Sequence, residues 1–170
     1  ILASTGQGRD ESLRSLALDV YLQRLLDDWQ VIRPHARISV TLQGEHPPPQ
    51  VTAERTLEQA LLNLLDNAAD AHAANPEALR FSASWDSDSC RIEIFDRGPG
   101  IGGEAALRLG QAFFSSKRAA HDQAGGIGIG LFLSNATIER CGGQVELFNR
   151  SDPQGGACTR VTLPLNRLKA

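Results

Sequence analysis

Hydrophobic residues between positions 57 and 71 recur every three or four residues, which is the period of an α-helix. The segment is rich in Ala and Leu, both good helix formers, and its apolar stripe consists of Leu57, Leu61, Leu64, Leu65 and Ala68. Asn63, Asn67 and Asp70 lie at i, i+4 and i+7, so they share a second, polar stripe. Because Asn is a mediocre helix former, this stripe is either a solvated face with local hydrogen bonds or a row of oxygens directed at a hydrated cation such as Mg²⁺.

The rest of the chain mixes helical and strand periods. A helix is expected over 13–32, capped by Ser12 and stopped by Pro34, with Leu16, Val20, Leu22, Leu25, Leu26 and Trp29 on its apolar face. Further helices are expected over about 104–109 and 131–140, strands over 37–42, 51–53, 79–86, 90–96, 144–149 and 159–165, and an irregular loop over 111–125. This order predicts an α+β fold: a two-layer α/β sandwich whose mixed, mostly antiparallel sheet is covered on one face by about three helices.

Length and composition narrow the possible functions. A chain of 170 residues with 41% hydrophobic and 22% charged residues fits one globular domain. We assign residues 13–170 to this domain and interpret the small, polar residues 1–12 as the remnant of a linker from a preceding domain. A net charge of −3 argues against nucleic acid as the main partner, and no apolar run has membrane-span length. The three widely spaced cysteines form no zinc pattern and favour a reducing compartment.

Asp96-Arg97-Gly98-Pro99-Gly100 directly follows a predicted strand. An Asp at a strand end is held rigidly and its carboxylate only accepts hydrogen bonds, whereas the exocyclic amine of adenine only donates them. Glycines two and four positions later would let the backbone approach a flat ring. Taken alone, the same sequence also fits a plain Asp–Gly turn.

Two further segments favour an anionic ligand. The run Gly126-Ile127-Gly128-Ile129-Gly130-Leu131 opens a predicted helix, so its backbone N–H groups would lie at the positive end of the helix dipole, as in a phosphate cradle. A flexible hinge is the alternative. The segment Phe113 to Lys117 (FFSSK) lies in the irregular loop, where two aromatic residues could anchor the chain while Lys117 moves over a polyphosphate. Here the alternative is a packed Phe pair with solvated cations.

Together, in this order, these segments resemble the Bergerat-fold ATP-binding domains of gyrase-type topoisomerases, Hsp90-type chaperones, MutL-type repair proteins and two-component histidine kinases. Asn63 to Asn67 is similar to the N box of that family, Asp96 to Gly100 and Gly126 to Leu131 to its two glycine boxes, and Phe113 to Lys117 to its F box. The resemblance covers roughly residues 50–165. The F box and the closing strand are similar to those of the histidine-kinase branch, and the stretches LFLSNATIERCGG and WDSDSCRIEIFDRGPGI resemble sensor kinases of the RegB/PrrB type.

The resemblance implies an ATP-binding catalytic domain that uses ATP and Mg²⁺ and transfers the γ-phosphate. It implies that Asn67 binds Mg²⁺, that Asn63 and Lys117 are the catalytic residues, that Asp96 takes the adenine amine, and that residues 118–125 form the ATP lid. The ATP-binding residues implied are Asn63, Asn67, Asp70, Asp96, Gly98, Gly100, Ile101, Phe113, Ser116, Lys117, Gly126, Gly128, Gly130 and Leu131. Hydrolysing members carry a Glu where this chain has Asn63, and a carboxamide is no base at neutral pH, which favours a kinase.

The acceptor of the phosphoryl group is expected outside this chain. In the family it is a His beside an acidic residue with a Pro a few positions on, and none of His35, His46, His72 and His121 fits that pattern. The implied partners are therefore a separate dimerisation and phosphoacceptor domain and, through it, a response regulator. The domain is expected in the cytoplasm, in a homodimeric full-length protein anchored in the inner membrane. A Ser/Thr kinase, a hydrolysing ATPase, a nucleotide sensor and a protein-interaction domain remain alternatives.

Overall fold

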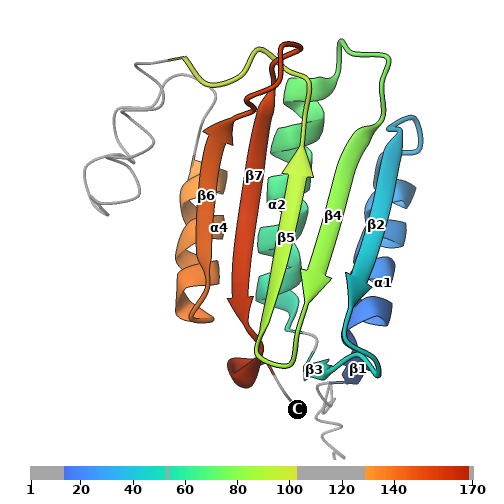
Figure 1. Ribbon diagram of the computed structural model, residues 1–170, viewed down its shortest axis with the longest axis vertical. Helices are drawn as coiled ribbons and strands as arrows, with labels where there is room; N and C mark the ends of the chain where they lie inside the picture. Colours follow the sequence, from blue (N-terminus) through green and yellow to red (C-terminus); the bar gives the residue numbers. More distant parts are fainter. Residues whose placement is uncertain (1–13, 53, 103–128, 169–170) are drawn as a thin grey trace, which may run out of the picture.

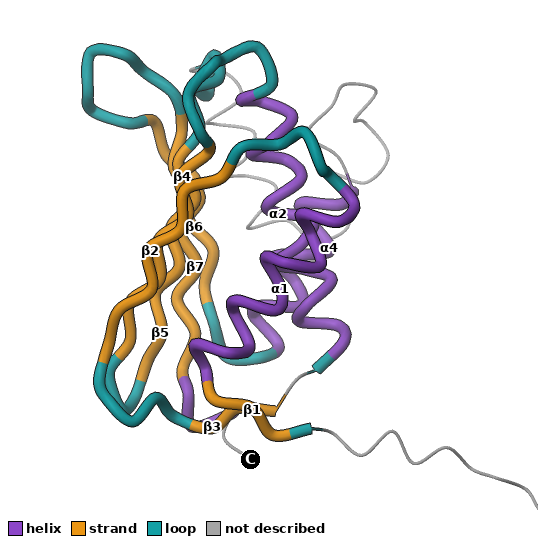
Figure 2. The backbone as a smooth tube through the Cα atoms, turned by 90° about the vertical axis from the view of Figure 1, so that its right-hand side faces the viewer, coloured by secondary structure: helices purple, strands orange, loops and turns teal. Residues whose placement is uncertain are grey.

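The computed structural model describes residues 14–52, 54–102 and 129–168, and these form two layers. Figure 1 looks onto a sheet with three helices behind it, and Figure 2 shows the same layers edge-on, with the helices on one side only. The helices are α1 (Leu18–Ile32), α2 (Arg55–His72) and α4 (Ile129–Arg140), with a short 3-10 helix, η1 (Leu165–Arg167). The strands are β1 (Ser15–Ala17), β2 (Ile38–Gly44), β3 (Gln50–Thr52), β4 (Leu79–Trp85), β5 (Ser89–Phe95), β6 (Gln144–Asn149) and β7 (Ala157–Pro164).

The main sheet has five strands in the order β2-β4-β5-β7-β6. Only β2 and β4 run parallel, which requires the crossover connection that β3 and α2 provide. The β4–β5, β5–β7 and β7–β6 pairs are antiparallel. The predicted α+β sandwich, with a mostly antiparallel sheet covered on one face, is therefore confirmed.

The core lies between the sheet and the helices. Along the three central strands every second residue is buried, and these positions face the helices: Leu79, Phe81, Ala83, Trp85, Cys90, Ile92, Ile94, Val161 and Leu163. Most outward positions are more exposed, with the buried Cys158 on β7 as an exception, and this is the alternation of a sheet with one covered face. From the helical layer, α2 contributes the predicted stripe, in which Leu64 and Leu65 are almost fully buried.

Helix α1 is fixed to α2 by polar contacts as well as by packing. The indole N–H of Trp29 donates to Asp66 Oδ1 over 2.9 Å, and Trp29 itself is buried. The guanidinium of Arg33 contacts Asp66 at 2.8 Å and Asp70 at 2.7 Å. These bonds bring Asp70, the acidic residue of the polar stripe, and the nearby Asp66 into contact with α1.

The first element differs from the prediction of one helix over 13–32. Residues Ser15 to Ala17 form a strand that pairs with β3, and the helix begins only at Leu18. The position of Leu16 suits both a helix and a strand. Pairing with β3, about 35 positions away, satisfies the backbone N–H and C=O groups that would otherwise bond within a helix. The N–H of Leu18 then donates to Pro49 O, so the predicted cap, Ser12, is not at the helix start and lies outside the described residues.

The other described elements agree with the predicted ones within about two residues at most ends. The predicted helix at 104–109 and the loop at 111–125 lie outside the described residues. Within the described ranges, no helix is both long and apolar enough to cross a membrane.

Candidate functional site

A cavity of about 350 Å³ lies between α2, the start of α4, the inner face of β6 and β7, and the segment that follows β5. Its lining residues are Leu64, Asn67, Ala68, Asp70, Ala71, Asp96, Pro99, Gly100, Ile101, Leu131, Leu147, Ala157 and Thr159. Most of this surface is apolar, and the polar groups are few. Such a lining suits a flat, largely apolar ring that is oriented by a small number of hydrogen bonds.

Asp96 is the acidic group deepest in this cavity, with only 4% of its surface exposed. Its Oδ1 accepts hydrogen bonds from the backbone N–H groups of Gly98 at 2.9 Å and Ala157 at 3.1 Å. The described residues donate no hydrogen bond to Oδ2. The carboxylate is thus fixed by one oxygen and presents the other as an acceptor for a donor on a ligand.

The glycines after Asp96 are required by the protein itself. A Cβ at Gly98 would collide with the carbonyl oxygen of Ala71 in the last turn of α2. Gly100 has a φ of 74°, in the left-handed region. Gly98 is not among the residues that line the cavity and lies close to α2; its approach to a bound ring stays a prediction.

Asn149, at the end of β6, holds the chain beyond Gly100. Its Oδ1 accepts the N–H of Ile101 at 2.6 Å, and its Nδ2 donates to the carbonyl of Ile101 at 2.9 Å. These paired bonds imitate a strand contact and keep Ile101 at the wall of the cavity. Asn149 was not predicted, because a single Asn at a strand end carries no distinctive signal.

Asn67 and Asp70 line the cavity from α2, and both are exposed. Asp70 also pairs with Arg33 on α1, so its carboxylate is shared. Asn63, one turn earlier, is not among the lining residues, and its Oδ1 accepts from Gln59 at 3.2 Å. The structure therefore brings two members of the predicted polar stripe to the cavity and leaves Asn63 outside it.

The described residues contain no group of three or more His, Cys, Asp or Glu side chains able to hold a metal. Mg²⁺, however, usually keeps several waters and takes only one or two protein oxygens together with phosphate. The amide oxygen of Asn67, exposed at the cavity, fits a cation held in that way.

Among the other predicted residues, Leu131 is buried in the cavity wall and Gly130 belongs to the first turn of α4. The remaining members of the F box and second glycine box, Phe113, Ser116, Lys117, Gly126 and Gly128, lie outside the described residues, as does the predicted lid over 118–125. Thr159 was not predicted. It lies on β7, is 6% exposed and lines the same cavity as Asp96. The alternation of the strand could have indicated this position.

A charged cluster outside the cavity contacts the segment that carries Asp96. Arg97 contacts Glu77 at 3.3 Å and also pairs with Asp152, while Arg150 pairs with Asp152 at 3.1 Å. The Arg97 guanidinium holds the pKa of the Asp152 carboxyl below its usual value. The cluster thus ties the loop after α2 and the β6–β7 loop to the segment that carries Asp96.

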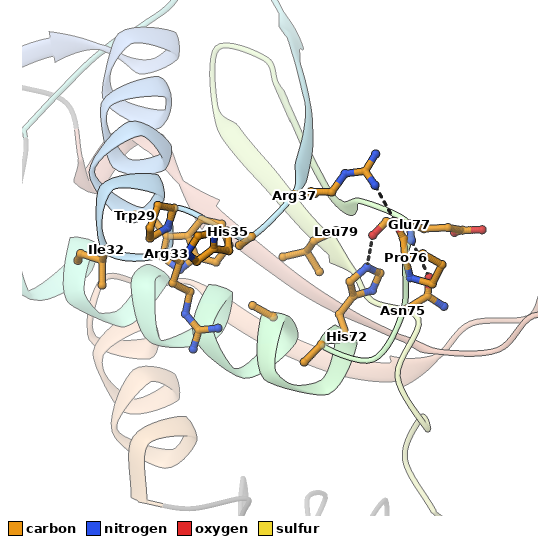
Figure 3. Close-up of a pocket in the computed structure, with 14 residues that line it drawn as sticks. Trp29, Ile32, Arg33, His35, Arg37, His72, Asn75, Pro76, Glu77 and Leu79 are labelled. Atoms are coloured by element: carbon orange, nitrogen blue, oxygen red, sulfur yellow. Dashed lines mark hydrogen bonds between the residues drawn. The ribbon is translucent and has the colours of Figure 1, made fainter.

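A second, larger cavity of about 510 Å³ lies at the ends of α1 and α2 and is lined by neither Asp96 nor Asn67 (Figure 3). Its lining includes Trp29, Arg33, Arg37, His72 and Glu77. None of the residues predicted to bind ATP lines it. The smaller cavity, which contains Asp96, Asn67 and Leu131, is therefore the candidate site.

Comparison with known proteins identifies the family of the chain. The sequence profile of the family described as histidine kinase-, DNA gyrase B-, and HSP90-like ATPases matches residues 52–167. The sensor protein KdpD of Escherichia coli K12 is 31% identical over 137 residues, which cover 79% of this chain and 15% of KdpD. The C4-dicarboxylate transport sensor protein DctB of Pseudomonas aeruginosa is 36% identical over 112 residues, 65% of this chain and 17% of DctB.

The sensor histidine kinase RegB of Cereibacter sphaeroides is also a relative, 27% identical over 139 residues, 74% of this chain and 29% of RegB. Sensor histidine kinases with other names share more identity, so the resemblance to the RegB type stays within this wider group. The chain spans less than a third of the length of each of these three relatives. Among solved structures, the catalytic domain of histidine kinase ThkA has a TM-score of 0.65 at 21% identity, covering 89% of this chain and 94% of that one, which supports the fold.

A two-layer sandwich with a buried carboxylate in an apolar cavity defines an ATP-binding domain of the Bergerat type. The chain belongs to the family of histidine kinase-, DNA gyrase B- and HSP90-like ATPases, as its profile match over 52–167 shows. Within that family it is a domain of the sensor histidine kinase type. The family membership implies ATP as the ligand.

Replacing Gly98 with Ala should destabilise the domain, because the new methyl group would meet the carbonyl of Ala71, which belongs to the backbone and cannot rotate away. We expect the free energy of unfolding, measured by urea denaturation, to fall by about 1–3 kcal/mol. Gly102→Ala is the matched control, since no atom lies within 4 Å of a Cβ built there. Equal unfolding midpoints for the two variants would contradict the proposed contact.

Proposed function

We propose that this domain binds Mg²⁺·ATP and donates the γ-phosphate to a His on a separate domain in two-component signalling. The observation that carries the proposal is the Asp96 carboxylate, buried in an apolar cavity and anchored by one oxygen only. The relatives named as sensor histidine kinases, each much longer than this chain, support an acceptor domain elsewhere in the protein. On the same grounds we propose a response regulator as the downstream partner, a homodimeric full-length protein and a membrane anchor outside the described residues.

In this proposal Asp96 recognises the adenine base. Its Oδ2 accepts the exocyclic amine, while the amides of Gly98 and Ala157 hold Oδ1 and so fix the direction of the free oxygen. The neighbouring cavity walls, Ile101 and Leu131, contact the ring, and Thr159 adds a hydroxyl beside it. A site built around a fixed acceptor rejects a base that offers a second acceptor in the same place.

In this proposal the phosphates lie near Asn67 and Asp70, the exposed residues through which α2 lines the cavity. Asn67 holds Mg²⁺ through its amide oxygen, and the cation neutralises part of the charge of the triphosphate when bound. Lys117 and the backbone of Gly126, Gly128 and Gly130 contact the phosphates, and Phe113 and Ser116 anchor the loop. These last assignments rest on the sequence motifs alone.

Asn63 favours transfer to a protein over hydrolysis. Its carboxamide orients a phosphate oxygen or a water but removes no proton at neutral pH. It lies one turn before Asn67 on α2, where a carboxylate would be in reach of an attacking water. Because phosphoryl transfer depends mainly on positioning and charge neutralisation, the domain requires no base of its own.

Asp96→Asn should lower ATP affinity selectively. The carboxamide oxygen can still take the Gly98 and Ala157 amides, but the NH₂ group then faces the adenine amine, so two donors oppose each other. We expect a loss of about 1–3 kcal/mol, or roughly 5- to 150-fold in Kd, by isothermal titration calorimetry. The wild-type protein should bind GTP poorly, because guanine presents a carbonyl at this position. Equal binding of ATP and GTP, or native ATP affinity in Asp96→Asn, contradicts the adenine assignment.

Phosphotransfer tests the proposal as a whole. The chain is incubated with γ-labelled ATP, Mg²⁺ and a separate acceptor-His domain, and we expect acid-labile, base-stable label on that domain and none on the chain alone. Asn67→Ala should keep its fold, since Ala suits a helix better than Asn, but reduce the transfer rate at least about tenfold, or 1.4 kcal/mol of barrier. Asn67→Asp should recover only part of the rate, because it restores an oxygen but adds charge near the phosphates.

The matched control is Gln23→Ala, which removes an exposed amide from α1 without touching the cavity and should transfer at the wild-type rate. Label on Ser or Thr, or release of free phosphate only, would assign the domain to another activity of the same fold. Unchanged transfer by both Asn67 variants would show that the metal is held elsewhere.

A further inference from the structure

The peptide unit between Asp96 and Arg97 is held at both of its polar ends. The carbonyl of Asp96 accepts from Arg150 Nη1 at 3.2 Å, and the N–H of Arg97 donates to His72 Nδ1 at 2.9 Å. A peptide unit is planar, so two bonds on opposite sides fix its rotation. That rotation sets where the next N–H, from Gly98, meets the Asp96 carboxylate.

His72 makes its contact in a defined protonation form. Because the Arg97 N–H is a donor, Nδ1 of His72 must be the unprotonated nitrogen of the ring. The proton is then on Nε2, which donates to the carbonyl of Glu77 at 2.7 Å, the bond drawn between these residues in Figure 3. The ring is 7% exposed, and each of its nitrogens has a partner. His72 therefore joins the end of α2 to the segment that carries Asp96.

No strand could supply this acceptor. Strand β5 ends at Phe95, and the N–H of Asp96 still donates to Ala157 O on β7, but the N–H of Arg97 lies beyond the ladder. Leaving this partly buried N–H without a partner is unfavourable, so without His72 the peptide unit would rotate or bind water. Either change would alter the direction of the Asp96 carboxylate.

We propose that His72 is a positioning residue for adenine recognition, acting on Asp96 through the Arg97 amide. This inference rests on the proposed role of Asp96. His72 does not line the smaller cavity, which contains Asp96, and lies instead in the wall of the larger cavity. It contacts no part of a ligand in the ATP cavity, so any effect on ATP binding passes through the backbone of Arg97.

Two substitutions separate the two nitrogens of the ring. His72→Asn keeps an acceptor near the position of Nδ1, whereas His72→Gln keeps a donor near the position of Nε2. We expect the Kd for ATP from calorimetry to rise about tenfold in His72→Gln and to stay within about threefold of the wild-type value in His72→Asn. The ratio of the Kd for GTP to the Kd for ATP, measured for each variant, gives the selectivity for adenine. This ratio should fall only in His72→Gln. His35→Gln is the matched control: it makes the same change at an exposed residue of the larger cavity and should leave the Kd unchanged.

A structural role alone would lower the unfolding midpoint of both His72 variants without separating their ATP affinities. Equal losses in Asn and Gln, or native affinity in His72→Gln, would overturn the inference. If wild-type ATP binding is itself independent of Asp96, the proposed function fails first, and the two failures are distinguishable. Should His72→Gln not fold, long-range ¹H–¹⁵N spectra of the wild-type ring decide: protonation at Nε2 supports the inference, and protonation at Nδ1 overturns it.

Discussion

The functional arrangement depends on the hydrogen bonds that turn the end of β5 into a fixed acceptor. At Asp96 the chain leaves the ladder, yet its carboxylate remains bonded to Ala157 on the neighbouring strand and to Gly98 ahead of it. A buried carboxylate is tolerated only when its hydrogen bonds are satisfied. Here two backbone N–H groups satisfy Oδ1, no described residue donates to Oδ2, and we propose that a ligand does. The apolar walls of the cavity strengthen any hydrogen bond that a donor makes to Asp96 Oδ2, because little water competes there.

Helix α2 provides the support for this arrangement and also carries residues of the site. Its buried stripe packs on the sheet, its exposed side brings Asn67 to the cavity, and its last turn contacts the Asp96 segment through Ala71 and His72. One rigid element thus sets the distance between Asp96, the proposed acceptor for the base, and Asn67, the proposed metal ligand. Such placement on a helix and a strand end gives more precise geometry than a loop could.

Much of this was accessible from the sequence, because the helix stripe and the Asp–Gly segment are local patterns. The hydrophobic period of α2, the β4–β5 hairpin and the position of Asp96 after a strand all follow from residues close together in the chain. The β1–β3 pairing and the parallel β2–β4 pair depend on contacts between distant segments, which local periods do not encode. The same limit explains why the contacts of Asn149, His72 and Gly98 became visible only in three dimensions.

The most direct test of the account is a crystal structure of the domain with Mg²⁺ and a non-hydrolysable ATP analogue. The account predicts that the exocyclic amine of adenine lies within hydrogen-bond distance of Asp96 Oδ2, while Oδ1 keeps the amides of Gly98 and Ala157. An adenine base bound instead in the larger cavity at the ends of α1 and α2, or an amine directed at another acceptor, would contradict it.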